Sequence, residues 1–237
     1  MRYDRRSVWW ALALATGFCS LVYELTMAQL LTGLLGNSLA RFATTIGVYI
    51  VGMGLGSVSF RETNTERDGQ VFLTAELCLF AIGFLSPALF VGIHHLSLVV
   101  SQDSGLQSDI VLTLTHLIIF LTGFFCGLEI PSLASLSSKS LSSSHAGTHV
   151  LAADYAGMFV ASLIFPFFLF PTYGLMASFA FATFLNLVCA LATYLLLPTK
   201  RRWLEVVFVI FFLLNVGIFI YASDLQDWLS HVYATTS

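Results

Sequence analysis

Seven long apolar runs are the feature of this 237-residue sequence that most restricts its fold. A helix needs about 20 apolar residues to cross the hydrocarbon core of a bilayer. Only helices and closed barrels satisfy their backbone hydrogen bonds in lipid, and continuous runs do not fit the alternating pattern of barrel strands. We therefore predict an all-α integral membrane protein with seven transmembrane helices in one domain, residues 1–237. The helices are expected at about residues 8–35, 40–60, 70–97, 110–136, 148–170, 173–197 and 203–222.

The composition supports a membrane protein and argues against nucleic-acid binding. Hydrophobic residues make up 57% of the chain and charged residues only 10%, whereas a soluble domain has about 25% charged residues. Because the chain is so apolar, we expect the lipid bilayer as a partner. The net charge is −3, so we expect no nucleic-acid partner. The first apolar run is too long for a cleavable signal peptide and lacks a small-residue cleavage site.

The ten basic residues predict the orientation in the membrane. Positively charged residues concentrate in short cytoplasmic loops. With a cytoplasmic N-terminus and an external C-terminus, only Arg41 is left outside. We therefore predict a multi-pass protein of the bacterial inner (plasma) membrane in this orientation. The nine basic residues placed in the cytoplasm are Arg2, Arg5, Arg6, Arg61, Arg67, Lys139, Lys200, Arg201 and Arg202.

Four carboxylates, Glu24, Glu76, Glu129 and Asp154, lie inside the apolar runs without a lysine or arginine beside them. An ionisable group inside a membrane is costly and is by default a candidate for function. Such acids can stay protonated, hydrogen-bond to hydroxyl and backbone groups, or bind a cation. The sequence leaves these three alternatives open.

Helix geometry gives the depth of these acids. At 1.5 Å per residue, Glu76 lies about 9 Å from the cytoplasmic end of its helix, and Asp154 lies at a similar depth. Glu129 is also placed in the cytoplasmic half, and Glu24 somewhat past the middle of the first helix. We predict that Glu24, Glu129 and Asp154 converge in one polar cavity. The candidate ligand-binding residues are Glu24, Glu129, Asp154, Tyr23, Tyr155, Ser20 and Glu76.

Proline and glycine positions predict breaks within the helices. Pro131 removes a backbone N–H, so residues 127–131 are expected to form a kinked polar break next to Glu129. Such breaks are tolerated where they are buried in protein or line a wet cavity. Pro166 is expected to disturb the fifth helix, and residues 171–174 are expected to form a tight turn.

An internal repeat is suggested by matches about 105 residues apart. Glu24 matches Glu129 at this offset, and three small or sulfur-containing residues of the second helix recur in the fifth. An offset of three helices inverts the second copy, as in transporters with inverted repeats. We therefore predict an inverted 3+3 repeat plus one C-terminal helix. The matching residues are Gly52, Met53 and Ser57 with Gly157, Met158 and Ser162.

No cofactor or metal site is expected. The four cysteines fall inside apolar runs, where small buried hydrophobes are common, and the six histidines have no familiar metal-binding spacing. His94 or His95 with His116 could converge from neighbouring helices, but we interpret them as polar surface or interface residues. Hydrolase motifs such as GxSxG and HExxH are missing from the sequence, so we predict no catalytic residues.

Several segments resemble the membrane-spanning spermidine synthase-like (polyamine aminopropyltransferase) proteins. The resemblance extends from about residue 10 to about residue 197. It is most specific in the fifth helix, where Asp154-Tyr155-Ala156-Gly157 is followed by Phe165-Pro166 and Leu169-Phe170-Pro171. The other matching segments are residues 17–25, 52–57 and 127–131.

The resemblance implies a connection to polyamines. Members of that family usually have a soluble aminopropyltransferase domain after the helices. We expect it to be absent here, because only one helix and a short tail follow Trp203. We predict that the chain binds a polyamine or another small cation for transport or for presentation to a soluble or membrane partner enzyme. The alternatives are a structural or assembly subunit of a membrane complex with protonated acids, and a membrane aminopropyltransferase-like enzyme.

Overall fold

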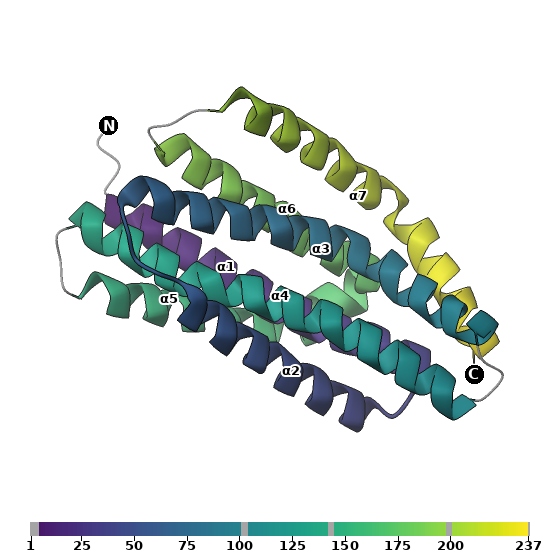
Figure 1. The fold of residues 1–237 in the computed structure, drawn as a ribbon. Coiled ribbons are helices and arrows are strands. Elements are labelled where there is room, and N and C mark those ends of the chain that lie inside the picture. The colour runs from purple at the N-terminus through teal and green to yellow at the C-terminus, as the bar shows by residue number, and fades with distance from the viewer. Residues whose placement is uncertain (1–4, 101–103, 142–144, 198–200, 237) are drawn as a thin grey trace.

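The computed structural model describes residues 5–100, 104–141, 145–197 and 201–236, and its regular secondary structure in these ranges is entirely helical. The helices form an elongated bundle in which segments far apart in the sequence lie side by side (Figure 1). They are α1 (Arg5–Leu35), α2 (Ser38–Ser59), α3 (Thr65–Val100), α4 (Ser104–Leu141), α5 (Ala146–Ile164), the π-helix η1 (Phe165–Leu169), α6 (Phe170–Leu196) and α7 (Arg202–Thr236).

Six helical stretches in the described residues are long and apolar enough to cross a membrane. They match all seven predicted segments to within one residue at the ends of 40–60 and 173–197, and the single stretch Ala146–Leu196 corresponds to both 148–170 and 173–197. Most helices extend a few residues past their predicted ends, and α7 extends furthest. The all-helical class and the membrane-compatible length of these helices are therefore established, whereas the number of membrane crossings is not.

The stretch Ala146–Leu196 is interrupted near its middle. The π-helix Phe165–Leu169 contains Pro166, and Gly174 adopts φ 79° and ψ −176°, a backbone conformation that strongly favours glycine. Beyond Gly174, Gln226 of α7 accepts hydrogen bonds from the backbone N–H groups of Leu175 (2.9 Å) and Met176 (3.3 Å). A side chain of α7 thus satisfies donors that the break in α6 leaves without helical partners.

The predicted break at residues 127–131 is wrong, because α4 continues as an α-helix through this segment. Pro131 still removes one backbone N–H. Next to it, the Ser132 hydroxyl is within donor distance of the carbonyls of Leu128 (2.7 Å) and Glu129 (2.8 Å). These bonds go to other carbonyls than that of Gly127, which loses its helical donor to Pro131.

Glycines bring α2 against α4. A Cβ atom added to Gly56 would lie 2.0 Å from the carbonyl oxygen of Phe124, and one added to Gly127 would lie 2.1 Å from that of Met53. Only residues without a side chain allow backbones this close. The helices α1 and α5 cross in the same way, as described below.

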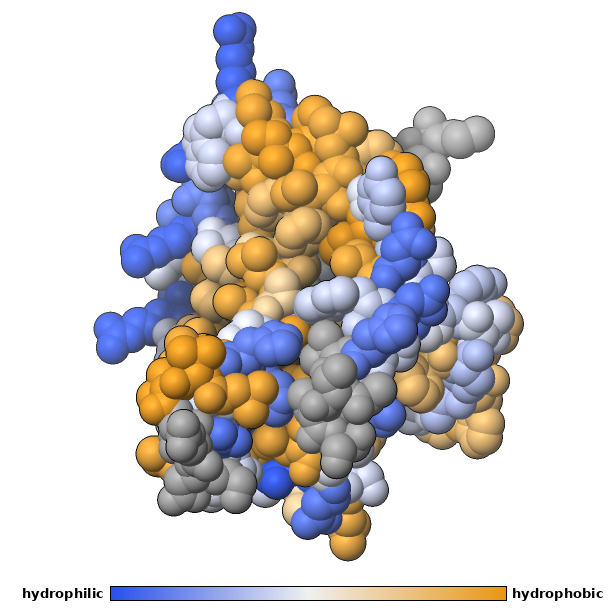
Figure 2. Space-filling view, turned by 90° about the vertical axis from the view of Figure 1, so that its right-hand side faces the viewer, coloured by the Kyte–Doolittle hydropathy of each residue, from blue (hydrophilic) through white to orange (hydrophobic). Residues whose placement is uncertain are grey.

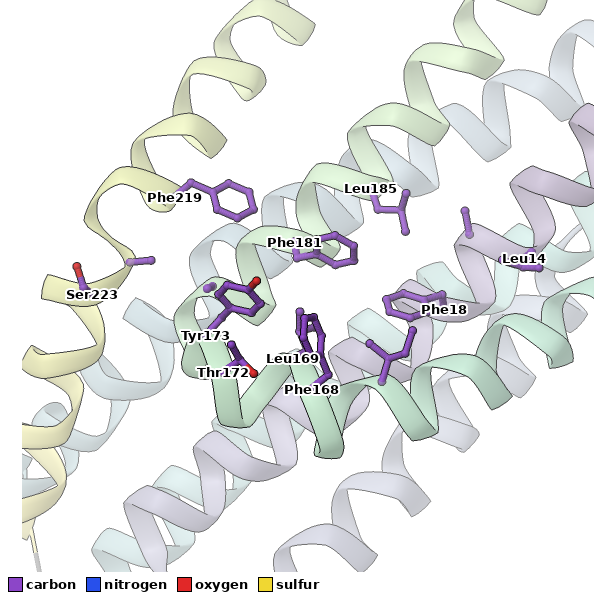
Figure 3. Close-up of a pocket in the computed structure, with 14 residues that line it drawn as sticks. Leu14, Phe18, Phe168, Leu169, Thr172, Tyr173, Phe181, Leu185, Phe219 and Ser223 are labelled. Carbon is purple, nitrogen blue, oxygen red and sulfur yellow. The ribbon is translucent and has the colours of Figure 1, made fainter.

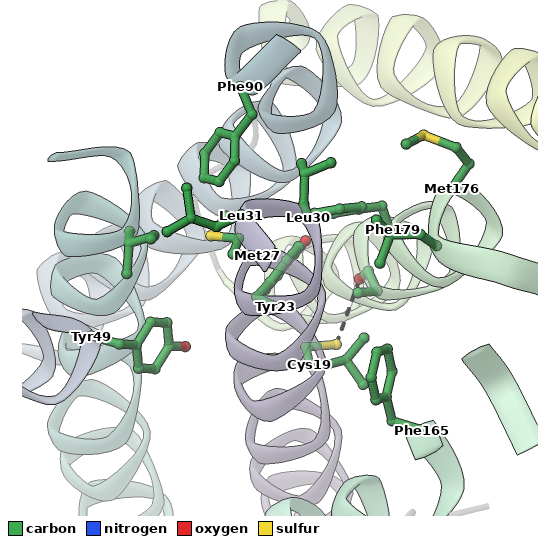
Figure 4. Close-up of a cluster of buried hydrophobic side chains, with 14 of the residues drawn as sticks. Cys19, Tyr23, Met27, Leu30, Leu31, Tyr49, Phe90, Phe165, Met176 and Phe179 are labelled. Atoms are coloured by element: carbon green, nitrogen blue, oxygen red, sulfur yellow. Dashed lines mark hydrogen bonds between the residues drawn. The ribbon is translucent and has the colours of Figure 1, made fainter. Parts of the chain in front are cut away.

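The centre of the bundle is built around α1. Tyr23, Met27, Leu30 and Leu31 are fully buried and pack against residues of the surrounding helices (Figure 4). In contrast, α2 and α7 expose many apolar side chains, as expected for helix surfaces that face lipid. The end of the bundle where α3 ends and α4 begins has hydrophilic side chains among apolar ones (Figure 2).

Candidate functional site

Three helices each contribute one buried carboxyl group to the interior of the bundle. Glu76 of α3, Glu129 of α4 and Asp154 of α5 are 0%, 3% and 3% exposed. The Glu129 carboxyl interacts electrostatically with both of the others. We call Glu76, Glu129 and Asp154 the carboxyl cluster.

The carboxyl cluster lacks the partners that buried acids normally have. Both carboxyl oxygens of Glu76, Oε1 of Glu129 and Oδ2 of Asp154 are buried without a hydrogen-bond partner. In the described part of the chain no ion pair involves any of the three acids. An unsatisfied buried polar group costs about 1–3 kcal/mol, and more when it is charged. The cluster is therefore stabilised neither by charge pairing nor by a hydrogen-bond network.

Further polar groups without partners lie around the cluster. Tyr23 of α1 and Cys189 of α6 both interact electrostatically with Glu76 and Glu129, and the Tyr23 hydroxyl has no hydrogen-bond partner. Asn186 and Thr193 are 1% exposed, and their side-chain polar atoms are also unpartnered. Residues 186, 189 and 193 share one face of a helix, so α6 presents these groups toward the cluster.

Glu24 lies apart from the carboxyl cluster. It is 6% exposed and interacts with Tyr49 of α2, whereas it is not among the charges that act on Glu129. One turn before it, the Ser20 hydroxyl lies 2.8 Å from the Tyr49 hydroxyl, which also lies 2.9 Å from the Ser20 carbonyl oxygen and 3.0 Å from Sγ of Cys126. The predicted binding residues thus divide into two groups.

The two predicted tyrosines differ in position. Tyr23 is fully buried beside the carboxyl cluster, whereas Tyr155 is 60% exposed. Because Asp154, its neighbour in sequence, is buried, Tyr155 lies on the outer surface of α5. The alternation is what a helix with one buried face produces.

The largest cavity that we describe has an apolar lining and is separate from the acids. It has a volume of about 950 Å³ and lies between α1, the α5–α6 break and α7, where Phe18, Phe168, Tyr173, Phe181 and Phe219 face it (Figure 3). A smaller one of about 280 Å³ between α3 and α4 is lined by Ala75 and Leu128, the sequence neighbours of Glu76 and Glu129. The four acids line neither of them.

One further buried acid, Asp68 of α3, was not among the predicted residues. It is 0% exposed and accepts hydrogen bonds from the Thr63 N–H (3.1 Å), the Thr63 hydroxyl (2.9 Å) and the Ser135 hydroxyl (2.7 Å). Lys139 donates to it at 2.5 Å and also pairs with Glu62 at 3.3 Å. This ion-pair cluster ties the α2–α3 connection to α4 at the predicted cytoplasmic end.

In the described residues, no group of three or more His, Cys, Asp or Glu side chains is arranged to bind a metal ion.

Comparison with known proteins relates the chain to polyamine aminopropyltransferases. It is 33% identical over 184 residues to a polyamine aminopropyltransferase of Leptospira interrogans. The aligned region makes up 77% of this chain and 34% of that protein. It is 29% identical over 199 residues to polyamine aminopropyltransferase 2 of Aquifex aeolicus, and the alignment covers 84% of this chain and 38% of that protein. Polyamine aminopropyltransferase 1 of Streptomyces coelicolor is 33% identical to the chain over 159 residues, and the alignment covers 66% of this chain and 28% of that protein.

The chain spans about a third of the length of the curated relatives that it matches. No protein-family model matches it, and no solved structure matches it. Identities of 24–33% to curated polyamine aminopropyltransferases nevertheless support a spermidine synthase-like relationship, in agreement with the resemblance in residues 10–197.

Proposed function

We propose that this protein binds a small organic cation, polyamine-like in chemistry, at the carboxyl cluster, for transport or for presentation to a partner enzyme. The observation that supports this most is the cluster itself: four buried carboxyl oxygens from three helices without a hydrogen-bond or ion-pair partner in the described residues. The protein would lie in a bacterial inner membrane with a cytoplasmic N-terminus and an external C-terminus, as the basic residues indicate.

A protonated amine supplies what the carboxyl cluster lacks. Each ammonium group has several N–H donors and a positive charge, and charge-assisted hydrogen bonds to carboxylates are about twice as strong as neutral ones. A polyamine has several such groups joined by methylene chains. It can therefore reach acids on different helices, while Asn186 and Tyr23 offer further polar contacts.

The relatives' names support a polyamine as the ligand. They are called polyamine aminopropyltransferases, and the matching region of this chain contains the carboxyl cluster. Because the chain spans about a third of their length, their transferase activity is not assigned to it. A membrane transferase stays an alternative, and in that case the acids would serve as general bases.

We also propose seven membrane crossings, six of them in two inverted three-helix repeats, followed by α7. A Cβ atom on Gly17 of α1 would lie 2.2 Å from the Asp154 carbonyl oxygen, and one on Gly123 of α4 would lie 2.3 Å from that of Tyr49. Gly17 corresponds to Gly123 at an offset of 106, and Tyr49 corresponds to Asp154 at 105.

The reciprocal glycines follow the same correspondence. A Cβ atom on Gly157 of α5 would meet the carbonyl oxygen of Leu14, and one on Gly52 of α2 would meet that of Phe120. Gly52 precedes Gly157 by 105 residues, and Leu14 precedes Phe120 by 106. The crossing of α1 with α5 thus repeats the crossing of α4 with α2. Inverted repeats of this kind are typical of secondary transporters, which favours transport among the proposed roles.

A structural subunit whose acids stay protonated is favoured by one observation, the 0–3% exposure of the carboxyl cluster. Amide variants separate the two functions. Gln and Asn are nearly isosteric with the acids and keep an acceptor while adding a donor. They would suit neutral hydrogen-bonding positions but would remove the charge that holds a cation.

The test is thermal unfolding of the detergent-purified protein with putrescine, spermidine, an amino acid or a nucleoside. We expect polyamines to raise the melting temperature of the wild type, and Glu129→Gln and Asp154→Asn to abolish that rise while still folding. Asp224→Asn removes an exposed acid of α7 and is the matched control. Equal stabilisation of both amide variants and the wild type would reject the cation site and favour the structural subunit.

A further inference from the structure

We infer a second cation-binding half-site on the other side of Tyr49, formed by Glu24 of α1, Thr45 of α2 and the Tyr49 hydroxyl. This inference rests on the proposed function, because it assigns the same class of ligand, a protonated amine, to a second position. The carboxyl cluster then forms the inner half-site, and Glu24 lies in the outer one.

Hydrogen bonds place Glu24 and Thr45 at the same height in the bundle. Ser20 and Tyr49 are level, because their hydroxyls lie 2.8 Å apart. The helices α1 and α2 are consecutive, packed together and antiparallel (Figure 1). Glu24 is one turn after Ser20, and Thr45 is one turn before Tyr49. Both steps lead toward the α1–α2 connection, so Glu24 and Thr45 lie level with each other.

Thr45 gives independent evidence that polar contacts are incomplete here. It is 0% exposed, and its hydroxyl has no hydrogen-bond partner. Most buried threonines in this protein bond a carbonyl of their own helix, as Thr26 does to Val22 at 2.7 Å. Thr45 and Tyr49 belong to the buried face of α2, which faces α1 and α4. The Thr45 hydroxyl is therefore level with Glu24 and has no hydrogen-bond partner of its own.

The third wall of the outer half-site is α4. The Thr122 hydroxyl lies 3.7 Å from Sδ of Met27, and Met27 is one turn after Glu24 on the same face of α1. Tyr49 closes the side toward the carboxyl cluster, where its hydroxyl contacts Ser20 and Cys126, and Figure 4 shows its ring pointing toward α1. Glu24 is thus enclosed by three helices.

The repeat correspondence relates the two half-sites. Glu24 precedes Glu129 by 105 residues, and Tyr49 precedes Asp154 by the same number. Each half-site therefore has a glutamate at the corresponding position of α1 or α4, and the second corresponding residue is a tyrosine in one and an aspartate in the other; the inner half-site also contains Glu76. With a single carboxyl group, the outer half-site should bind an amine more weakly than the inner one. For an amine to pass from one half-site to the other, the hydrogen bond between the Tyr49 and Ser20 hydroxyls must break.

Equilibrium binding of radiolabelled spermidine to the full chain in detergent tests this assignment. We expect two classes of site on the wild type. Glu24→Gln should lose only the weaker class, and Glu129→Gln only the tighter one. Thr45→Val, which keeps the side-chain shape, should weaken the weaker class at least several-fold without lowering the melting temperature of the ligand-free protein. Thr26→Val is the matched control and should leave both classes intact.

The outcomes separate the two proposals. A single class of site that Glu129→Gln removes and Glu24→Gln retains would overturn the outer half-site and leave the proposed function standing. Two classes that both survive Glu24→Gln and Thr45→Val would also overturn it. If the wild type binds no spermidine, the proposed function and the outer half-site fail together.

Discussion

Asp68 and Glu76 lie two turns apart on α3 and are both fully buried, but their surroundings differ completely. Asp68 accepts hydrogen bonds from Thr63, Ser135 and Lys139, whereas neither oxygen of Glu76 has a partner. A buried charge that serves the fold is paired and hydrogen-bonded. Asp68 fits that description and Glu76 does not: Asp68 holds two helices together, whereas Glu76 belongs to the proposed ligand site.

The largest effect in this comparison is expected at Lys139. Lys139→Met keeps the aliphatic stem and removes the ammonium group, leaving Asp68 buried without its cation. Removing one partner of a buried ion pair costs about 3 kcal/mol or more. We expect the free energy of unfolding to fall by about 3 kcal/mol, the lower end of that range, because Lys139 is 24% exposed and Asp68 keeps its hydroxyl donors. Unfolding in detergent measures it, with Arg61→Met as the matched control on an exposed arginine.

The double variant Asp68→Asn/Lys139→Met should recover part of that loss. Asparagine has no charge left to compensate, and its amide oxygen can still accept from Thr63. We expect about half of the Lys139→Met destabilisation to return, because residues in one network are not additive. A double variant that is less stable than either single variant would mean that the Asp68 carboxylate does not depend on Lys139.

A smaller effect is expected at Ser135, which donates to Asp68 across the α3–α4 contact. Ser135→Ala should destabilise the protein by about 1 kcal/mol, the usual net value of one hydrogen bond. Ser162→Ala is the control, because the Ser162 hydroxyl is exposed and bonds only a carbonyl of its own helix. Equal losses for both variants would contradict a tie between α3 and α4 at Ser135.

The sequence was sufficient for the helices, because long apolar runs determine them. It was not sufficient for Asp68, which the predicted helix 70–97 left in a connecting segment; α3 begins at Thr65 and includes it. The pairing of Asp68 with Lys139 joins residues 71 positions apart. No local pattern encodes such a contact.

The same limit applies to the surroundings of the acids. Asn186 and Thr193 are single polar residues in an apolar run, and only the packing of α6 against α1 and α3 buries them. Their spacing of seven, with Cys189 between, was a usable signal of one helix face. The break predicted at residues 127–131 shows the opposite error: Pro131 removes one backbone N–H, but α4 continues as an α-helix through this segment.

The smallest effect on stability should occur at Glu76, and it is the sharpest test of the comparison with Asp68. Glu76→Gln loses no hydrogen bond, because neither carboxyl oxygen has a partner, and it removes any cost of holding a charge in the bundle. We expect the ligand-free variant to unfold within about 0.5 kcal/mol of the wild type, since substitutions away from defined interactions usually stay in that range. Glu76→Leu should be as stable or more stable, because apolar replacements of buried polar groups are often neutral or stabilising. A loss of 2 kcal/mol or more in Glu76→Gln, comparable to Lys139→Met, would show that Glu76 has a structural partner after all. The distinction between a structural acid and a ligand-binding acid on α3 would then fail.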